Sequence, residues 1–292
     1  MKMLILYNIF SRNNLEHKFE IIQSSLSEKY DIDIFKANEE DSLYNKILED
    51  GNLYDVILAL GGDGTVNVAV NAIMHLDKKP KLAILPFGTC NDIARSLGIK
   101  NIKKGLKMIN EDSYGPLNIY KINDSYFVYG LATGGVSNIS YEVDRKQKRI
   151  FGKNAYYLNT LKAVFEKNPK IDLIIDDGNF HIDDTFYLML AINTRYLAGF
   201  KIKGGKKIYN SSKLRVILFK KQHRLTGFIS FALYILFGIK NKNVITFDTE
   251  KLSIICNTDA VFNTDGEYTK FNKELDILSL SNELIVFGKT IQ

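Results

Sequence analysis

Apolar and polar positions along the first third of the chain predict strands that alternate with helices. Short apolar runs bounded by polar or glycine residues are typical of buried strands. They are KMLILYN, YDIDIFKA, YDVILAL and KLAILPF, which begin at Lys2, Tyr30, Tyr54 and Lys81. Apolar residues at helical spacing predict helices at about 14–29, at about 42–50 and from Val66 onward. Such alternation predicts a parallel sheet covered by helices.

The pattern changes near residue 120. Strand-like runs then dominate, with few helices between them: KIDLIID, TFYLMLAINT, SKLRVILFKK, VITFDTEKLSIICN and ELDILSL. This succession predicts a mainly antiparallel second domain. We therefore expect an α/β domain at 1–120 and a β-rich domain at 121–292, with C-terminal residues that pack back on the first domain as an alternative.

Glycines separate a predicted strand from a predicted helix in ILALGGDGTVN, residues 57–67. In α/β proteins such a junction binds phosphate, because the amides at a helix start lack partners and glycine lets an anion approach the backbone. The stretch matches neither a P-loop nor GxGxxG. Since a carboxylate repels phosphate, Asp63 indicates a bridging Mg²⁺ bound mainly by water and nucleotide. The alternative is a tight turn that needs three glycines.

A second strand, glycine and helix junction follows in PFGTCNDIARSLGI, residues 86–99. Asn91 or Asp92 is suited to cap the helix start, and Gly98 is suited to end the helix. Two such junctions in one parallel sheet place their loops side by side at the carboxyl edge. A nucleotide would lie there.

The bulk composition leaves a globular cytosolic protein as the expectation. The chain has 292 residues, of which 46% are hydrophobic, and this suits packed cores. The start MKMLILYN is only strand length, and no apolar run approaches the roughly 20 residues of a membrane span. Cys90 and Cys256 lack CxxC spacing, so neither a disulfide framework nor a zinc site is supported.

Charge is distributed unevenly around a net value of +6. No Asp or Glu occurs between Thr185 and Phe247, whereas the same segment carries twelve basic residues: Arg195, Lys201, Lys203, Lys206, Lys207, Lys213, Arg215, Lys220, Lys221, Arg224, Lys240 and Lys242. Such asymmetry indicates an anionic partner.

One stretch inside this basic segment points to a membrane surface. RLTGFISFALYILFG, Arg224 to Gly238, is almost entirely apolar after its first residue, is too short to span a bilayer and is flanked by lysines. That composition is typical of an interfacial helix on anionic lipid. Nucleic acid is not expected, because no reading module is present. A buried helix with a solvated basic face is the structural alternative.

The C-terminal stretch NTDGEY contains two carboxylates, Asp265 and Glu267, on either side of a glycine. Two neighbouring acids can raise one pKa toward a value that suits proton abstraction, which makes Glu267 the best candidate for a general base. Asp-Gly is also the strongest short turn signal between strands, so a plain hairpin is the alternative and is favoured by this stretch taken alone.

Taken together, GGDGTVN, PFGTCNDIARSLGI, LATGG, GKNAYYLNTLKAV, NTRYLAGF and FNTDGEY occur in the order found in the bacterial diacylglycerol kinases and related lipid kinases, which this chain resembles nearly end to end. The resemblance implies a Rossmann-like nucleotide domain, a β-rich lipid domain and Mg-ATP-dependent phosphoryl transfer to a lipid hydroxyl. NAD kinases share GGDGT but lack the FNTDGEY ending and the basic interfacial run, so they rank well below.

The motifs suggest a role for each candidate residue. Gly61, Gly62, Gly64 and Thr65 would form the phosphate cradle. Thr89 would approach the phosphates from the second loop, while Asn67 and Asn91 would support the two helix starts. By resemblance, Glu267 is the general base, Asp63 and Asp92 bind magnesium through water, and Asn8 and Ser11 remain from the N-terminal nucleotide loop. Asp265 would raise the pKa of Glu267 or steer the metal.

The chain departs from the family pattern in four places. The Asn-Pro-x-Ser-Gly nucleotide loop is NIFSR, Val68 replaces an acid after GGDGTVN, and Asn118 replaces an aspartate. An Asp-Asp-Gly that helps to hold a structural magnesium in some members is Asn210, Ser211 and Ser212 here, so we predict no structural metal at that place.

Two classes of function follow. The first is an ATP-dependent lipid kinase, with diacylglycerol as the leading acceptor and sphingoid bases or prenols as alternatives. The second is a peripheral lipid-binding protein that has lost catalysis, which Val68, Asn118 and the altered first loop suggest. Retention of Asp63, Asp265 and Glu267 favours the enzyme. A lipid substrate and an anionic membrane surface are the expected partners, and a homodimer is left open.

Overall fold

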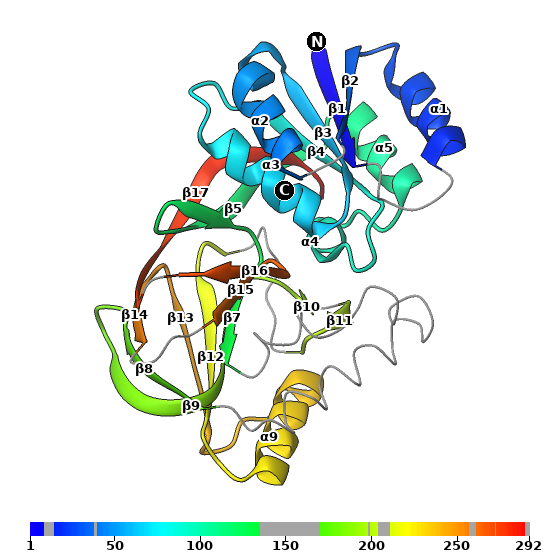
Figure 1. The fold of residues 1–292 in the computed structure, drawn as a ribbon. Helices are drawn as coiled ribbons and strands as arrows, with labels where there is room; N and C mark the ends of the chain where they lie inside the picture. Colours follow the sequence, from blue (N-terminus) through cyan, green and yellow to red (C-terminus); the bar gives the residue numbers. More distant parts are fainter. Residues whose placement is uncertain are drawn as a thin grey trace.

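The computed structural model describes residues 1–8, 15–37, 40–134, 170–197, 199–203, 211–256, 261–271 and 273–289. Figure 1 shows an α/β domain at the N-terminal end and a β-rich domain beside it. The α/β domain contains β1 (Lys2–Asn8), α1 (Leu15–Leu26), β2 (Asp31–Ala37), α2 (Glu40–Asp50), the short 3-10 helix η1 (Gly51–Leu53), β3 (Val56–Gly61), α3 (Asp63–Met74), β4 (Lys81–Pro86), α4 (Asp92–Ser96) and α5 (Ile102–Asn110).

The β-rich domain is built from mainly antiparallel strands. They are β5 (Tyr114–Ile122), β6 (Ser125–Phe127), β7 (Gly130–Gly134), β8 (Ile171–Asp176), β9 (His181–Ile192), β10 (Tyr196–Leu197), β11 (Phe200–Lys201), β12 (Leu214–Lys220), β13 (Val244–Thr249), β14 (Lys251–Cys256), β15 (Val261–Thr264), β16 (Glu267–Lys270) and β17 (Glu274–Phe287). One long helix, α9 (Arg224–Phe237), lies between β12 and β13 in the sequence. This arrangement confirms the predicted class of an α/β domain plus a β-rich domain.

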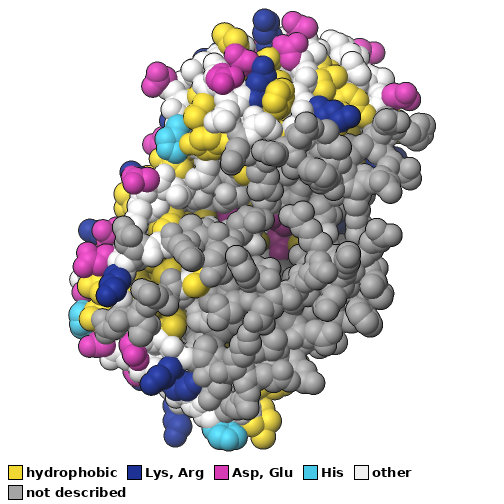
Figure 2. All heavy atoms as spheres, in the orientation of Figure 1, with side chains coloured by type: hydrophobic (Ala, Val, Ile, Leu, Met, Phe, Trp, Pro, Cys, Tyr) yellow, Lys and Arg dark blue, Asp and Glu magenta, His cyan; other side chains and the backbone are white. Residues whose placement is uncertain are grey.

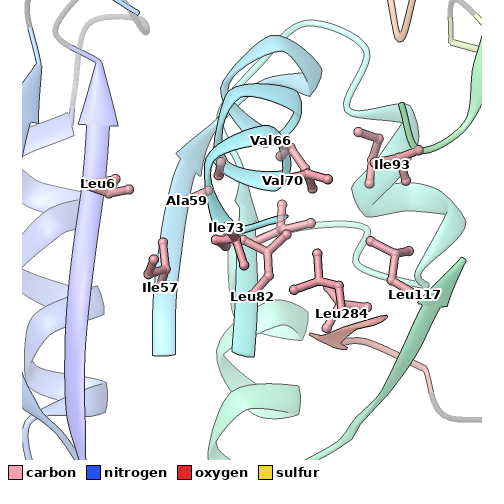
Figure 3. Packing of buried hydrophobic residues seen from close by; sticks show 14 of the residues in the cluster. Leu6, Ile57, Ala59, Val66, Val70, Ile73, Leu82, Ile93, Leu117 and Leu284 are labelled. Atoms are coloured by element: carbon pink, nitrogen blue, oxygen red, sulfur yellow. The ribbon is translucent and has the colours of Figure 1, made fainter. Parts of the chain in front are cut away.

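The parallel part of the sheet has the order β4-β3-β1-β2. Every residue of β3 is buried, because helices cover both faces of the sheet. Val66, Val70 and Ile73 recur at helical spacing on α3 and pack on Ile57 and Ala59 of β3 (Figure 3). Replacing Ile73 with alanine would cost about 2–5 kcal/mol through lost burial and the cavity left behind.

Strand β17 belongs to both domains. Its first half pairs with β14 and β5 in the antiparallel sheet, and near its end Val286 pairs in parallel with Leu82 of β4. The register shifts between Leu280 and Leu284, where the strand passes from one domain to the other. In Figure 3, Leu284 of β17 and Leu117 of β5 lie beside the α3 core. The C-terminal strand therefore completes the core of the α/β domain.

Several predicted element bounds were wrong. Helix α3 begins at Asp63 instead of Val66, because Gly62 is its N-cap and the glycines already belong to the turn. The run VITFDTEKLSIICN is two strands, β13 and β14, joined at Glu250. Helix α5 was not predicted, although Asn101 caps its start by accepting from the amide of Lys104 at 2.9 Å.

Candidate active site

Three strand ends meet at the carboxyl edge of the parallel sheet. Gly61 at the end of β3 pairs with Pro86 at the end of β4, and β1 lies on the other side of β3. Asn8 is the last residue of β1; its backbone pairs with Ala37, and its side chain is outside the described part. Ser11 also lies outside the described residues. The two glycine loops are thus neighbours, as the sequence predicted.

The two loops touch through glycine backbone. A Cβ added at Gly88 would lie 2.3 Å from the Cα of Gly62, and one added at Gly62 would lie 3.1 Å from the Cα of Gly88. The amide of Phe87 also donates to the carbonyl of Gly61 at 2.9 Å. Because any side chain at Gly88 would force the loops apart, the sequence needs glycine there for close approach.

The start of α3 is open to an anion. Gly62 is the N-cap residue and provides no side chain to cap the helix, so the first-turn amides of α3 receive no side-chain acceptor from that position. The carbonyl of Gly62 accepts from the amide of Val66 at 3.1 Å. The Thr65 side chain lies against Gly61, since a Cβ there would meet Thr65 Oγ1 at 2.3 Å. A helix start of this kind favours phosphate through its amides and its dipole.

Asp63 links the two loops. Its Oδ1 accepts from the amide of Ile93 at 3.0 Å, so the carboxylate caps the start of α4 from the neighbouring loop. Burial raises the pKa of Asp63 above its usual value, while hydrogen bonds from the backbone of Ile93, Asp92 and Asn91 oppose that rise. The sequence predicted a role for Asp63 in binding phosphate and metal. In the structure its side chain also holds the second loop through the hydrogen bond from Ile93.

The second loop is closed by Asn91, which adopts the left-handed conformation with φ 52°. Its Oδ1 accepts from the amide of Gly88 at 2.8 Å, and its Nδ2 donates to the Gly88 carbonyl at 2.9 Å. Helix α4 follows and ends before Gly98, whose φ is 81°, as predicted. Thr89 lies half-buried between Gly88 and Asn91.

Helix α4 is tied to the β-rich domain. Asp92 is fully buried, and its two oxygens accept from the Gly199 amide at 3.1 and 3.0 Å. Arg95 donates to the Gly199 carbonyl at 3.1 Å and lies over the ring of Tyr196 at 4.8 Å. The buried hydroxyls of Ser96 and Thr194 are 2.8 Å apart. In this arrangement the Asp92 carboxylate joins the domains, and its predicted water-mediated contact with magnesium stays a prediction.

Asp265 is a buried carboxylate with four donors. Its Oδ2 accepts from the Val128 amide at 2.6 Å and from Asn67 Nδ2 at 3.0 Å, and its Oδ1 accepts from the amides of Tyr129 and Gly130 at 2.8 and 3.0 Å. Burial raises the pKa of Asp265 to about 6, although these hydrogen bonds act to lower it. Through Asn67, the first turns of α3 are bonded to the turn that precedes Glu267.

Asn71 is a functional candidate that the sequence analysis missed. It pairs with the backbone of Tyr126, accepting from its amide at 2.8 Å and donating to its carbonyl at 2.9 Å, and it also donates to Asn67 Oδ1 at 3.1 Å. Asn67 and Asn71 are spaced by one helical turn, which places both on one face of α3. The four-residue spacing of the two asparagines was the available signal for a polar face on this helix.

The NTDGEY stretch forms a hairpin. Asp265 and Gly266 have φ of 51° and 92°, and Thr264 pairs with Glu267 across the turn. Two residues with positive φ are typical of the type I′ turn that Asp-Gly favours. The backbone of Glu267 opens β16, and its side chain lies outside what the structure describes. The hairpin and the catalytic interpretation are compatible, because Asp265 anchors the turn to α3.

At Asn118 and Ser211, where the family has acids, this chain has a network of amide and hydroxyl donors. Asn118 Nδ2 and Asn193 Nδ2 donate to the carbonyl of Ser211 at 2.8 and 3.2 Å. The hydroxyls of Tyr120 and Ser279 donate to the carbonyl of Ser212 at 3.1 and 2.7 Å. These two carbonyls are therefore satisfied by amide and hydroxyl donors. Val68 lies half-buried on α3 against the α/β core.

The side chains do not form a metal cage in the part of the chain that is described. There, no group of three or more His, Cys, Asp or Glu side chains is placed to hold a metal ion. The carboxylates of Asp63 and Asp92 both accept backbone amides. This donor set fits magnesium only as an ion that keeps its waters and is carried by nucleotide phosphates.

Comparison with known proteins identifies the family. Residues 2–122 match the diacylglycerol kinase catalytic domain. A diacylglycerol kinase from Bacillus subtilis (strain 168) is 31% identical over 219 residues, covering 74% of this chain and 72% of that protein. One from Staphylococcus aureus (strain JH9) is 35% identical over 218 residues, covering 74% and 69%.

Solved structures agree. A diacylglycerol kinase from Bacillus anthracis str. Sterne has a TM-score of 0.80 at 26% identity, with 99% of this chain and 96% of that chain covered. An NAD kinase from Archaeoglobus fulgidus, solved in complex with ATP, has a TM-score of 0.56 at 15% identity, with 99% and 94% covered, and shares the fold alone. The chain belongs to the diacylglycerol kinase family of lipid kinases, enzymes that phosphorylate an alcohol group.

Proposed function

We propose that this protein transfers the γ-phosphoryl group of ATP to the hydroxyl of diacylglycerol and so produces phosphatidic acid. The observation that carries the proposal is the contact between Gly62 and Gly88 beside the uncapped start of α3. Phosphoryl transfer depends mainly on positioning and on offsetting charge. Two adjoining glycine loops at a helix start without a side-chain cap support both the positioning and the charge stabilisation of nucleotide phosphates.

Magnesium would be held by the nucleotide and by water molecules, which the carboxylates of Asp63 and Asp92 would bind. When bound, the ion offsets the charge that develops on the phosphate oxygens. Asp63 itself holds the start of α4 and the second loop in place, because it accepts a hydrogen bond from the Ile93 amide. Gly88 of that loop lies against Gly62 of the first loop, and Thr89, next to Gly88, is proposed to contact the phosphates.

Glu267 is the proposed general base. It would accept the proton of the lipid hydroxyl while that oxygen bonds to the γ-phosphorus and the bond from the γ-phosphorus to the bridging oxygen breaks, releasing ADP. Asp265 fixes the hairpin by accepting from Tyr129, Gly130 and Val128. Because Asn67 also donates to Asp265, helix α3 is hydrogen-bonded to the turn that precedes Glu267.

The acceptor is expected to come from a membrane, because diacylglycerol has one hydroxyl on a largely apolar body. We propose that the enzyme acts peripherally on the cytoplasmic membrane surface. The acid-free segment between Thr185 and Phe247 supports attraction to anionic lipid.

The direct test is transfer of labelled γ-phosphate from ATP to a panel of pure lipids in mixed micelles: diacylglycerol, a sphingoid base, a prenol and monoacylglycerol. Label in phosphatidic acid, dependent on added Mg²⁺, is expected. Preferential label in another lipid would replace diacylglycerol as the acceptor. No transfer to any lipid, with ATP bound, would support the binding protein without catalysis.

A further inference from the structure

The inner face of α9 packs against the β-rich domain. Phe231 and Tyr234 pack on Phe219 of β12, with ring centroids 5.4 and 6.0 Å apart. The Tyr187 hydroxyl donates to the carbonyl of Gly227 at 2.8 Å. Ser230 accepts from Asn241 Nδ2 at 2.7 Å. These contacts fix which side of the helix faces the protein.

The outer face of α9 is apolar as well. Successive helical residues turn by about 100°, which places Leu225, Ile229 and Leu236 within about 40° of one another and opposite the buried residues. With Phe237 and Ile239 they form a set that we call the α9 patch, whose members are 46% to 63% exposed. A helix that is apolar all round is normally buried. The α9 patch therefore indicates a surface that something covers.

Charge around the α9 patch selects the covering partner. The exposed side chains of Lys240 and Lys242 follow the helix, and exposed Lys203 lies beside its end, where the Lys203 amide donates to the Ile235 carbonyl at 3.2 Å. Among the described residues these three lysines form no ion pair, whereas Lys220 at the end of β12 is paired with Asp184 at 2.6 Å. An apolar patch with a cationic rim and no acid on its helix matches an anionic bilayer.

The position of α9 in the molecule is also consistent with contact to a bilayer. It projects at the end of the β-rich domain away from the α/β domain (Figure 1). In Figure 2 hydrophobic side chains lie at that lower end, beside Lys or Arg and His side chains. No helix in the described ranges is long and apolar enough to cross a membrane. At 1.5 Å per residue, α9 is about 21 Å long, so it would lie in the interface plane.

We propose that the α9 patch inserts into the interface of an anionic membrane, with Lys203, Lys240 and Lys242 on the lipid headgroups. This deepens the proposed function and rests on it, because it names the surface by which a lipid kinase reaches its substrate. The alternative is that a second copy of this chain covers the α9 patch, and the test distinguishes the membrane from the second copy.

The chain contains no tryptophan, which allows a clean optical test. Phe237→Trp puts one fluorophore in the α9 patch, where Phe237 is 63% exposed, and Leu53→Trp puts one at a matched site that is 65% exposed, in η1 of the α/β domain. With phosphatidylcholine–phosphatidylglycerol vesicles, the emission of Phe237→Trp should shift to the blue and be quenched by bromine on the acyl chains. That of Leu53→Trp should do neither.

A second pair of measurements uses Leu236→Ser with Phe237→Ser. Partition onto the same vesicles should fall about tenfold or more, since two large apolar side chains no longer leave water. Transfer to a short-chain diacylglycerol dissolved as monomers should not change. Lys203, Lys240 and Lys242 changed together to glutamine should weaken binding to anionic vesicles and leave binding to neutral ones as it was.

Three results would overturn the insertion. The first is vesicle binding without quenching of Phe237→Trp. The second is unchanged partition of the double serine variant. The third is a blue shift without vesicles that follows conversion to a dimer in sedimentation, which would assign the α9 patch to a second copy. Quenching does not depend on catalysis, so a wild type that phosphorylates no lipid would refute the proposed function and leave the insertion to be decided by the quenching.

Discussion

Substitution of Asp265 by asparagine should change how the stability of this protein depends on pH. Asp265 is 1% exposed and anchors the hairpin of Glu267, and its burial raises its pKa from 3.8 to about 6. A carboxyl whose pKa is higher in the folded state binds a proton more tightly there than in the unfolded chain. Its contribution to stability is therefore largest below about pH 4 and is lost as pH rises through about 6.

The magnitude follows from the shift. With a pKa of 3.8 in the unfolded chain and about 6 in the folded protein, the ionisation of Asp265 costs about 3 kcal/mol of stability at pH 7 and roughly half as much at pH 5. Asparagine has the same shape and does not titrate. Its lost hydrogen bonds to Tyr129 and Gly130, or to Val128 and Asn67, do not vary with pH. The slope with pH therefore isolates the carboxyl.

The assay is urea unfolding of both proteins, followed by circular dichroism at several pH values. Between about pH 7 and about pH 5, the free energy of unfolding of the wild type should rise relative to Asp265→Asn by about 1 kcal/mol. All other titrating groups are shared and cancel in the difference. A difference that stays flat with pH, or that favours the variant more at low pH, would refute the assignment of a raised pKa to Asp265.

Two further changes test the loops. Gly88→Ala brings a methyl within 2.3 Å of the Gly62 Cα, so it should lower the free energy of unfolding by about 1–3 kcal/mol. It should also weaken ATP binding in calorimetry. Unchanged ATP affinity would contradict the role of these two loops in binding the nucleotide. Asp63→Ala removes the acceptor for the Ile93 amide and a charge near the phosphates, so it should cost about 1 kcal/mol of stability and abolish Mg²⁺-dependent turnover. Full activity of that variant in excess chelator would show that neither Asp63 nor magnesium is needed.

Local patterns in the sequence were sufficient for the parallel sheet and the glycine loops. Strand β3 is a continuous apolar run because both its faces are covered, and such a run is visible in sequence. The contact of Gly62 with Gly88 follows once β3 and β4 are neighbours. The apolar character of α9 was visible in the sequence too, but the exposure of its outer face was not, because a helix that is apolar all round is normally buried.

Hydrogen bonds and strand pairings between residues far apart in the chain could not be predicted from the sequence. Asn67 and Asp265 are 198 positions apart, and nothing in one sequence joins an amide on a helix to a carboxylate in a turn. Strand β17 crosses between domains through a register shift between Leu280 and Leu284, which breaks the alternation that a strand prediction relies on. The capping of α4 by Asp63 depends on the packing of two loops, so sequence alone suggested only phosphate and metal.

Comparison of the wild type with Glu267→Gln tests the central claim most directly. Glutamine keeps the shape of the side chain but cannot accept the proton of the lipid hydroxyl. ATP should still bind, while transfer of labelled γ-phosphate to diacylglycerol should fall by roughly two to four orders of magnitude. A normally folded Glu267→Gln enzyme that phosphorylates diacylglycerol at the wild-type rate would contradict the account and leave NTDGEY as a structural hairpin.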